Sequence, residues 1–385
     1  METLQRLQNR GSVSTGYDVN NSLKLEHDND EQLERASSNG NRRTWTHSCW
    51  FKIIDPSADY AFVLQHFGVN NQATRINVDP GQNFKLSIDL CDTGTTVYRT
   101  ITNRQFRDPS AWYHVVVAVD TTQATDSNRL KVYVNGVQET SFSQTQYPTQ
   151  NLDTLANVSG YGNEAIATYP WAGATYDGLF SGYIAEHILV DGQQLTPTSF
   201  GKFDTNGIWT PIDPSSITFG TNGHYLKFDD SSSLGADSGN SNDYTTYNIA
   251  AADQATDTPT NNFCTLNPAV NFKYTTNGIT EGGTVFGADT GGGVGGAFGT
   301  MAVTAGKWYW EVKLTQQNSH YIGVSAVDDG DNVLSSTDPQ EENSTFRFNI
   351  SAARREYVNS GSQGYGSLDE FTDFHSAGAI IGIAL

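Results

Sequence analysis

The stretch WYHVVVAVDTTQATDSNRLKVYVNG, residues 112–136, decides the fold class. Its first part, WYHVVVAVD (112–120), is a short apolar run typical of a β-strand. Its last part, LKVYVNG (130–136), ends on Asn135 and Gly136. This pair favours a two-residue type I′ hairpin turn, because both turn positions need a positive φ. The stretch therefore predicts successive strands with a tight β-hairpin.

Similar short segments recur on both sides of this stretch. In TWTHSCWFKI (44–53), Trp45 and His47 alternate with Thr46 and Ser48, which is the period of two expected for a sheet. Further predicted strands of this region are SLKLEH (22–27), FVLQHF (62–67), FKLSIDL (84–90), GYIAEHILV (182–190) and YLKFDD (225–230). Long amphipathic helices are absent from the pattern, and only 17% of residues are charged, against ~25% in typical domains. The sequence therefore predicts an all-β protein.

A second strand-rich region follows a polar connector. Its predicted strands are KWYWEVKLTQ (307–316), YIGVSAV (321–327) and GAIIGIAL (378–385). Short strands at even spacing with turn signals between them predict two β-sandwiches in series. We expect an N-terminal docking arm at 1–20, a first sandwich at 21–230, a linker at 231–262 and a second sandwich at 263–385.

The charge of the chain excludes some partners. It has 42 acidic and 22 basic residues, for a formal net charge of −20. Nucleic-acid binding needs clustered Lys and Arg, and an acidic chain is also repelled by an anionic membrane surface. The apolar runs are far shorter than the ~20 residues that span a bilayer. We therefore expect neither a nucleic-acid partner nor membrane insertion.

Four motifs carry a resemblance to a known family. WTHSCWFK, FRDPSAWYHVVVAVD, LKVYVNGVQ and GYIAEHILVDGQQLTPTSFG occur in the order and spacing of a laminin-G-like, concanavalin A-type jelly roll. The later GKWYWEVKL, YIGVSAVD and GAIIGIAL resemble the front part of a SPRY-type sandwich. The resemblance implies a concanavalin A-like sandwich followed by an incomplete SPRY-like one. Since GAIIGIAL should be a central strand with a neighbour on each side, we expect either chain beyond Leu385 or another chain that completes the sheet.

The segments NRGSVSTGYD and DTPTNNFCTLNP together with these folds resemble structural proteins of bacteriophages that infect aquatic bacteria. The resemblance implies a virion protein, a tail fibre, spike or appendage subunit whose lectin-like domains attach to a host surface polysaccharide. The alternative is a capsid decoration or tail-assembly protein that uses its sandwiches for protein contacts. The arm at 1–20 would contact other virion proteins, and a homo-oligomer stays open.

A glycan hydrolase is the third hypothesis, since glucanases of this fold use Glu-x-Asp-x-(x)-Glu on a strand. The segment from Glu26 to Glu31 is a formal match. Its spacers, His27, Asn29 and Asp30, are polar, whereas the enzyme motif needs apolar residues that point into the core. We therefore expect no glycosidase activity and assign no catalytic residue.

The loop YGNEAIATYPWAGATYDG (161–178) is the candidate ligand site. Tyr169, Trp171 and Tyr176 lie in a Gly-, Pro- and Ala-rich loop, so their rings can stack on the apolar face of a sugar. Asp177 could bond sugar hydroxyl groups. The alternative is a contact with a neighbouring subunit, because aromatic residues are also enriched at protein interfaces.

Calcium is the one cofactor that the sequence leaves open. Laminin-G-like sandwiches often bind calcium at a rim through carboxylates, the oxygen ligands that this ion prefers. The candidate carboxylates are Asp28 and Asp30, with Glu31, and Asp229 and Asp230, with Asp237; Asp328, Asp329 and Asp331 form a third cluster. None of these matches an EF-hand. We expect no other cofactor: the three cysteines form no CxxC pair, the eight histidines are dispersed, and Gly291, Gly293 and Gly296 precede a strand segment rather than a helix.

Overall fold

The structure is a computed structural model of the 385-residue chain. It describes residues 16–55, 62–69, 72–93, 96–169, 180–271, 278–287, 297–315, 321–325, 345–349, 354–359, 362–367 and 377–385. In these ranges the helices are single 3₁₀ turns: η1 (His27–Asn29), η2 (Pro80–Gln82), η3 (Asp126–Asn128), η4 (Pro197–Ser199) and η5 (Ala251–Asp253). No helix of the described residues is long and apolar enough to cross a membrane. The all-β fold class is confirmed.

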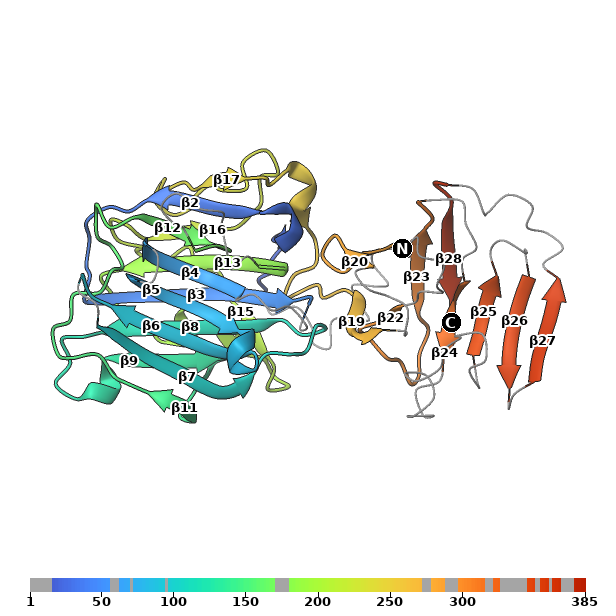
Figure 1. The fold of residues 1–385 in the computed structure, drawn as a ribbon, viewed down its shortest axis with the longest axis horizontal. Coiled ribbons are helices and arrows are strands. Elements are labelled where there is room, and N and C mark those ends of the chain that lie inside the picture. The colour runs from blue at the N-terminus through green and yellow to red at the C-terminus, as the bar shows by residue number, and fades with distance from the viewer. Residues whose placement is uncertain are drawn as a thin grey trace. The chain divides into compact units, whose positions relative to one another are not determined.

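The chain divides into two compact units. Of the described residues, those between 16 and 269 and those at 279–285 form the first unit. The second unit contains residues 270, 271, 278 and those from 286 onward. Figure 1 shows both units as strand-rich, with the first unit in blue to yellow and the second in orange to red.

Two antiparallel sheets build the first unit. Sheet 1 has the order β10 (Val137–Gln138), β9 (Leu130–Val134), β8 (Tyr113–Asp120), β3 (Thr44–Ile53), β13 (Gly182–Asp191), β1 (Ser22–Leu25) and β18 (Gln254–Ala255), and β16 (His224–Leu226) pairs with β13. Sheet 2 has the order β11 (Phe142–Thr145), β7 (Val97–Gln105), β6 (Lys85–Cys91), β5 (Gln72–Asp79), β4 (Phe62–Val69), β12 (Asn163–Ile166), β2 (Gln32–Ala36) and β17 (Thr245–Tyr247). The strands expected from the sequence at 44–53, 62–67, 84–90, 112–120 and 182–190 are present as β3, β4, β6, β8 and β13.

The main core lies between the two sheets. Sheet 1 contributes Trp45, Phe51 and alternate valines of β8, while sheet 2 contributes Phe62 and Phe67, all fully buried. Such a core stabilises the fold because each large apolar side chain contributes roughly 1.5–3 kcal/mol on burial. The apolar residues that alternate along these strands in the sequence are therefore those whose side chains point into the core.

The turn at the end of β9 has the expected geometry. Asn135 has φ 47° and Gly136 has φ 79°, and β9 pairs with β10 across them. A side chain at Gly136 would also collide with the ring of Trp209. Both the positive φ and the lack of space therefore require glycine at this position. The predicted type I′ hairpin is confirmed by these dihedral angles.

The segment 231–262 differs from the linker that we expected. It supplies β17, which pairs with β2, and β18, which pairs with β1. Asp257 accepts hydrogen bonds from the buried Lys52 ammonium and from the Trp112 indole. The segment is attached to the sandwich by these polar contacts and by Leu234 and Tyr244, whose side chains are buried in the main core.

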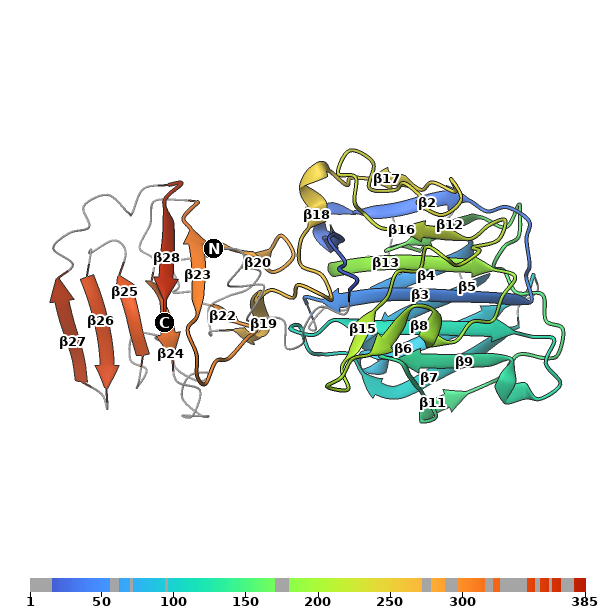
Figure 2. The ribbon, with the colours of Figure 1, turned by 180° about the vertical axis from the view of Figure 1, so that it is seen from behind.

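The outer face of sheet 1 is covered by the segment that carries the hairpin of β14 (Gly201–Phe203) and β15 (Trp209–Pro211). Figure 2 shows this yellow-green segment in front of sheet 1. Phe200 and Phe219 pack there against Ile188 and Val190 of β13. Val19, also on this face, packs beside Trp50 and Trp112. Of the expected docking arm, residues 16–20 thus belong to the sandwich, and residues 1–15 lie outside the described ranges.

The second unit contains short antiparallel strands. Their bounds, with those of the strands that lead into it, are β19 (Leu266–Asn271), β20 (Ile279–Thr280), β21 (Val285–Phe286), β22 (Ala297–Gly299), β23 (Tyr309–Lys313), β24 (Tyr321–Ser325), β25 (Thr345–Asn349), β26 (Arg354–Asn359), β27 (Ser362–Ser367) and β28 (Ile380–Ala384). Strands β24 to β27 form a four-stranded meander, and β23 pairs with β28. The expected strands at 307–316, 321–327 and 378–385 are present as β23, β24 and β28; the SPRY-like assignment stays a prediction.

The environment of β28 differs from that of the expected central strand. Among the described residues its one partner is β23, and the Ile380 side chain is 62% exposed whereas Ile383 is buried. The apolar sequence of this segment predicts a strand, but it does not determine how many strands pair with it. The continuation of the chain past Leu385 stays an expectation.

Candidate functional site

The predicted aromatic loop begins at Tyr169, three residues after β12. Trp171, Tyr176 and Asp177 lie outside the described residues. The Tyr169 ring lies against sheet 2, with the guanidinium carbon of Arg75 5.3 Å from its centroid and the His66 ring centroid at 5.5 Å. Burial raises the pKa of Tyr169 to about 12, so its hydroxyl group stays neutral. Tyr169 is therefore half-buried against the outer face of sheet 2.

Beside Tyr169, three charged residues form one row across neighbouring strands. Arg75 of β5 pairs in register with Asp89 of β6, and Asp89 with Arg99 of β7. Asp89 Oδ2 accepts from Arg75 Nε at 2.7 Å and from Arg99 Nη2 at 2.8 Å, and its Oδ1 accepts from Arg99 Nε at 2.6 Å. Because core residues such as Ile76 and Ile88 occupy the alternate positions, the row faces outward. Sequence reasoning did not identify these three residues.

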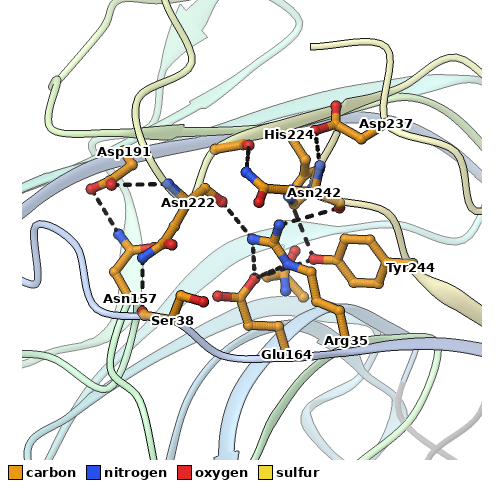
Figure 3. A network of polar contacts seen from close by, with 12 residues as sticks. Arg35, Ser38, Asn157, Glu164, Asp191, Asn222, His224, Asp237, Asn242 and Tyr244 are labelled. Atoms are coloured by element: carbon orange, nitrogen blue, oxygen red, sulfur yellow. Dashed lines mark hydrogen bonds and ion pairs between the residues drawn. The ribbon is translucent and has the colours of Figure 1, made fainter. Parts of the chain in front are cut away.

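A second group of polar residues lies inside the sandwich (Figure 3). Arg35 of β2 and Glu164 of β12 point into the interior, where Arg35 Nε donates to Glu164 Oε2 at 2.8 Å. Arg35 also donates to the carbonyl oxygens of Asn222 and Asn242. The guanidinium carbon lies 5.0 Å from the ring centroid of Tyr244, whose hydroxyl group donates to Glu164 Oε2 at 3.3 Å. Arg35 thus joins sheet 2 to the segments on both sides of β16.

Three buried histidines extend this group into sheet 1. His47 Nε2 lies 3.2 Å from His187 Nε2, and His187 Nδ1 lies 3.0 Å from His224 Nε2. His224 Nδ1 lies 3.4 Å from the hydroxyl group of Tyr244. Burial lowers the pKa of all three histidines, so they are neutral at physiological pH. They form a neutral hydrogen-bonded chain within the core.

A cavity of about 270 Å³ opens above the Arg35 network. It is lined by Arg35, Ala36, Ser38, Asn222, Ser241, Asn242 and Asp243. Around it, Asp191 accepts from Asn157 and from the backbone N–H of Asn222 (Figure 3). Asn242 Nδ2 donates to the carbonyl oxygens of Thr221 and Gly223, so its amide group holds the loop. The volume of this cavity lies just below the ~300–1,000 Å³ usual for ligand pockets.

A third group lies on the outer face of sheet 1, at a bulge in β13. The register of β13 shifts between Ala185 and Ile188, and Glu186 has φ 49°. A non-glycine residue in this region is strained, and bulges of this kind redirect a side chain. Glu186 Oε2 lies within hydrogen-bond distance of the hydroxyl groups of Tyr17, at 2.9 Å, and Tyr225, at 2.7 Å, and the two hydroxyl groups lie 2.8 Å apart.

These three oxygens have a definite proton requirement. Three short oxygen–oxygen contacts need three protons, and the two tyrosines supply two. The carboxyl proton of Glu186 is the third, so the geometry favours the protonated acid. Burial raises the pKa of Glu186 to about 7, in agreement with this geometry. Tyr17 and Tyr225 also line a cavity of about 340 Å³ with Asp213, Lys227 and Asn240.

We predict that Glu186→Gln stabilises the protein at pH 8 by up to about 3 kcal/mol relative to the unmutated chain. The pKa of this acid is near 4.5 when unfolded and about 7 when folded, so the folded state binds the extra proton. Stability is therefore lost as the pH rises from 4.5 to 7, and glutamine removes that loss. Urea unfolding at pH 4.5 and pH 8 checks this, with the exposed Glu311→Gln as the control. An equal effect of Glu186→Gln at both pH values would contradict the prediction.

The glucanase-like acids are not arranged as in a catalytic strand. Glu26 follows β1, and its side chain accepts from the backbone N–H of Gly282. Glu31 Oε2 accepts from the backbone N–H of Glu26 at 2.7 Å, and its Oε1 accepts from Asn29 Nδ2 at 3.0 Å. Between them lies η1, and Asp30 has φ 55°. The Glu31 carboxylate thus holds the turn around η1 together, and the Glu26 carboxylate ties the start of this turn to Gly282.

The calcium candidates occupy turns. The exposed Asp28 contacts His27, while Asp229 pairs with Lys227 at 3.1 Å. Asp230 Oδ1 accepts from Ser232, which is the pattern of a polar turn. Within the described ranges, no three His, Cys, Asp or Glu residues form a group that could hold a metal ion. Asp328, Asp329, Asp331 and the glycine string at 291–296 lie outside those ranges, and calcium binding stays a prediction.

The comparison with protein families identifies the first sandwich. Residues 25–186 match the Laminin_G_3 model, described as the Concanavalin A-like lectin/glucanases superfamily. The first sandwich has the laminin G fold. The expectation drawn from the four sequence motifs is confirmed for this part of the chain. Among curated protein sequences, no match is found.

Solved structures with a similar sandwich come from varied sources. Mouse laminin α1 domains LG4-5 match with a TM-score of 0.35 and 10% identity, over 97% of this chain and 74% of that one. A heptameric SAP-like pentraxin from Limulus polyphemus has a TM-score of 0.33 and 17% identity, over 47% and 80%. Tailspike protein 2 of Escherichia coli O157:H7 bacteriophage CAB120 has a TM-score of 0.31 and 13% identity, over 46% and 23%. Likeness at this level concerns the fold alone.

Proposed function

We propose that this chain is an outward-facing structural subunit of a phage particle, a tail fibre, spike or appendage, whose laminin G sandwich binds a host surface glycan without cleaving it. The observation that carries the proposal is the arrangement around Tyr169. An aromatic ring lies on the outer face of sheet 2 beside Arg75 and Arg99, at the start of the aromatic loop. Aromatic rings and charged hydrogen-bonding groups are the means by which proteins hold sugars in place.

Two further observations support binding rather than hydrolysis. The matched family contains both lectins and glucanases. The residues of the site, and not the fold, therefore distinguish binding from hydrolysis. Hydrolysis of a glycosidic bond needs two carboxyl groups flanking that bond. Glu26 and Glu31, the acids of the glucanase-like motif, instead accept the backbone N–H groups of Gly282 and of Glu26, respectively. The phage assignment rests on the resemblance of the terminal and connector segments.

A capsid-decoration or assembly role is the second candidate, because an apolar patch lies on the first unit. Phe203 and Ile208, on the β14–β15 hairpin, are 50% and 46% exposed. Phe203 packs on Trp209, which also contacts Gly136, and the neighbouring Val137 is exposed as well. Contiguous exposed apolar residues are typical of protein–protein contacts.

The test measures binding of the whole chain to host cells and to their purified surface polysaccharide. We expect Trp171→Ala to weaken binding about fivefold or more, the effect of one aromatic contact worth ~1 kcal/mol, at unchanged melting temperature. Tyr247→Ala, which removes an exposed tyrosine of β17, is the matched control.

Three outcomes would count against the proposal. Wild-type protein that binds no host glycan, with assembly impaired by Phe203→Ser, would favour the structural role. Equal binding by Trp171→Ala and wild type would place the glycan away from the aromatic loop. Sugar release that is abolished by Glu26→Gln would establish a hydrolase.

A further inference from the structure

We propose that the Arg75–Asp89–Arg99 row is a subsite for an anionic group of the glycan, a carboxylate or a sulfate, so that the ligand is an acidic polysaccharide. The inference rests on the proposed function and names its ligand class. The overall charge of −20 gives no indication of an anionic ligand. The indication comes from the local arrangement of the Arg75, Asp89 and Arg99 side chains.

The first argument is the direction of the donors. Asp89 is 1% exposed and uses both oxygens on the two Nε atoms and on Arg99 Nη2. Within the described residues, the remaining Nη atoms of Arg75 and Arg99 make no hydrogen bond. Arg75 reaches Asp89 through Nε alone and Arg99 through its Nε and Nη2 edge, which leaves both Nη groups of Arg75 and Nη1 of Arg99. The two side chains come from alternate strands of sheet 2 and are 20% and 38% exposed.

The second argument is the local charge. One buried carboxylate serves two guanidinium groups, so the row itself carries one net positive charge. Asp79 and Lys85, which pair in register on the same face, add no net charge. Tyr169 adds no negative charge, because its pKa of about 12 keeps the hydroxyl group protonated. By contrast, Arg43 and Asp153 form a one-to-one pair on the surface.

The third argument is rigidity. The Arg75 guanidinium lies against the Tyr169 ring, and Arg99 is held to Asp89 through two of its nitrogens. An arginine fixed in this way loses little side-chain entropy when it binds a ligand. Carboxylate and sulfate oxygens accept parallel N–H donors from a guanidinium fork, and such charge-assisted bonds are the strong ones. The row is therefore preorganised for an oxyanion.

The experiment compares matched polymers on the whole chain. The probes are polygalacturonate, its carboxyl-reduced form, dextran sulfate and dextran, together with host cells. We expect wild-type protein to bind one acidic polymer at least tenfold more tightly than its neutral counterpart, and this preference to weaken with salt. The carboxylate and sulfate pairs distinguish the two sources of the anion. Equal affinity for charged and neutral members of both pairs would overturn the proposal.

The variants are Arg99→Gln, Arg99→Lys and, as the control, Arg43→Gln. Arg99→Gln should lower the affinity for the acidic polymer about tenfold with an unchanged melting temperature, because Arg75 still pairs with Asp89. Arg99→Lys should restore part of the affinity, and Arg43→Gln should change nothing. If wild type binds host cells and Arg99→Gln binds them equally, the subsite is wrong while glycan binding stands. If wild type binds neither cells nor polymers, both proposals fail.

Discussion

Replacing Lys52 by methionine should lower the free energy of unfolding of the first unit by about 3–5 kcal/mol, the usual cost of breaking a buried ion pair by removing one partner. The Lys52 side chain is fully buried, and its Nζ donates to Asp257 Oδ2 at 2.8 Å, to Asn262 Oδ1 at 2.9 Å and to the carbonyl oxygen of Phe263 at 3.0 Å. Methionine removes the donor that these three acceptors share, and the buried Asp257 carboxylate then keeps only uncharged donors such as the Trp112 indole. The segment that contains Asp257 should then detach from β3.

Urea unfolding of the whole chain measures this loss. The control is Lys227→Met, which removes a partly exposed partner of Asp229 and should cost less than about 1 kcal/mol. The double variant Lys52→Met/Asp257→Leu should recover part of the loss, because it removes the uncompensated charge. A cost for Lys52→Met no larger than that for Lys227→Met would contradict the prediction.

The second large effect is expected at Arg35. Arg35→Met should also cost about 3–5 kcal/mol, because the Glu164 carboxylate is fully buried and loses its cationic partner. Burial raises the pKa of Glu164, and Arg35 opposes that rise. Without Arg35 the pKa rises further, so the folded state binds a proton that the unfolded state has lost. The destabilisation should therefore be greater at pH 8 than at pH 5.

Thermal unfolding at both pH values checks this expectation. Arg43→Met is the matched control, because Arg43 and its partner Asp153 are 42% and 48% exposed, and this variant should cost far less than Arg35→Met. A pH-independent loss would mean that the charge of Glu164 is not the cause.

The strands that sequence reasoning found share one property. In β8, and in β3 except at the buried His47, every second side chain is apolar and enters the core, so composition and period agree. The turn at Asn135 and Gly136 could be predicted for a similar reason, because the conformation of a hairpin turn depends on its own two residues. The fold class could be predicted because each of these signals lies within about ten residues.

The missed strands have polar side chains where a core residue is expected. In β2 the inward position after Leu33 is Arg35, whose charge is paired with that of Glu164, 129 residues away along the chain. β17 attaches to β2 through three residues and has no apolar period of its own. Patterning cannot identify such strands, because their partners are defined by the fold.

The candidate site shows the same limit. Arg75, Asp89 and Arg99 are ordinary outward charges in the sequence, and only the register of β5, β6 and β7 aligns them. A signal did exist, since each charge occupies an outward position of its strand. Tyr169 was identified from its loop, yet its contact with Arg75 could not be foreseen. At Glu186 the signal was an acidic residue within an apolar strand segment. This pattern predicts that the Glu186 side chain is buried, but it does not predict the bulge in β13.

The way the chain alternates between its two units constrains how such a protein can be assembled by recombination. After residue 269 the chain enters the second unit and then returns at 279–285, where Gly282 accepts from Tyr183 and Leu266 donates to Gly283. A single crossover in the polar stretch before residue 263 would leave Tyr183 and Lys24 without these contacts. A gene segment that transfers the intact laminin G unit must therefore extend to residue 285, so exchange of binding modules would carry the start of the second unit along with the first.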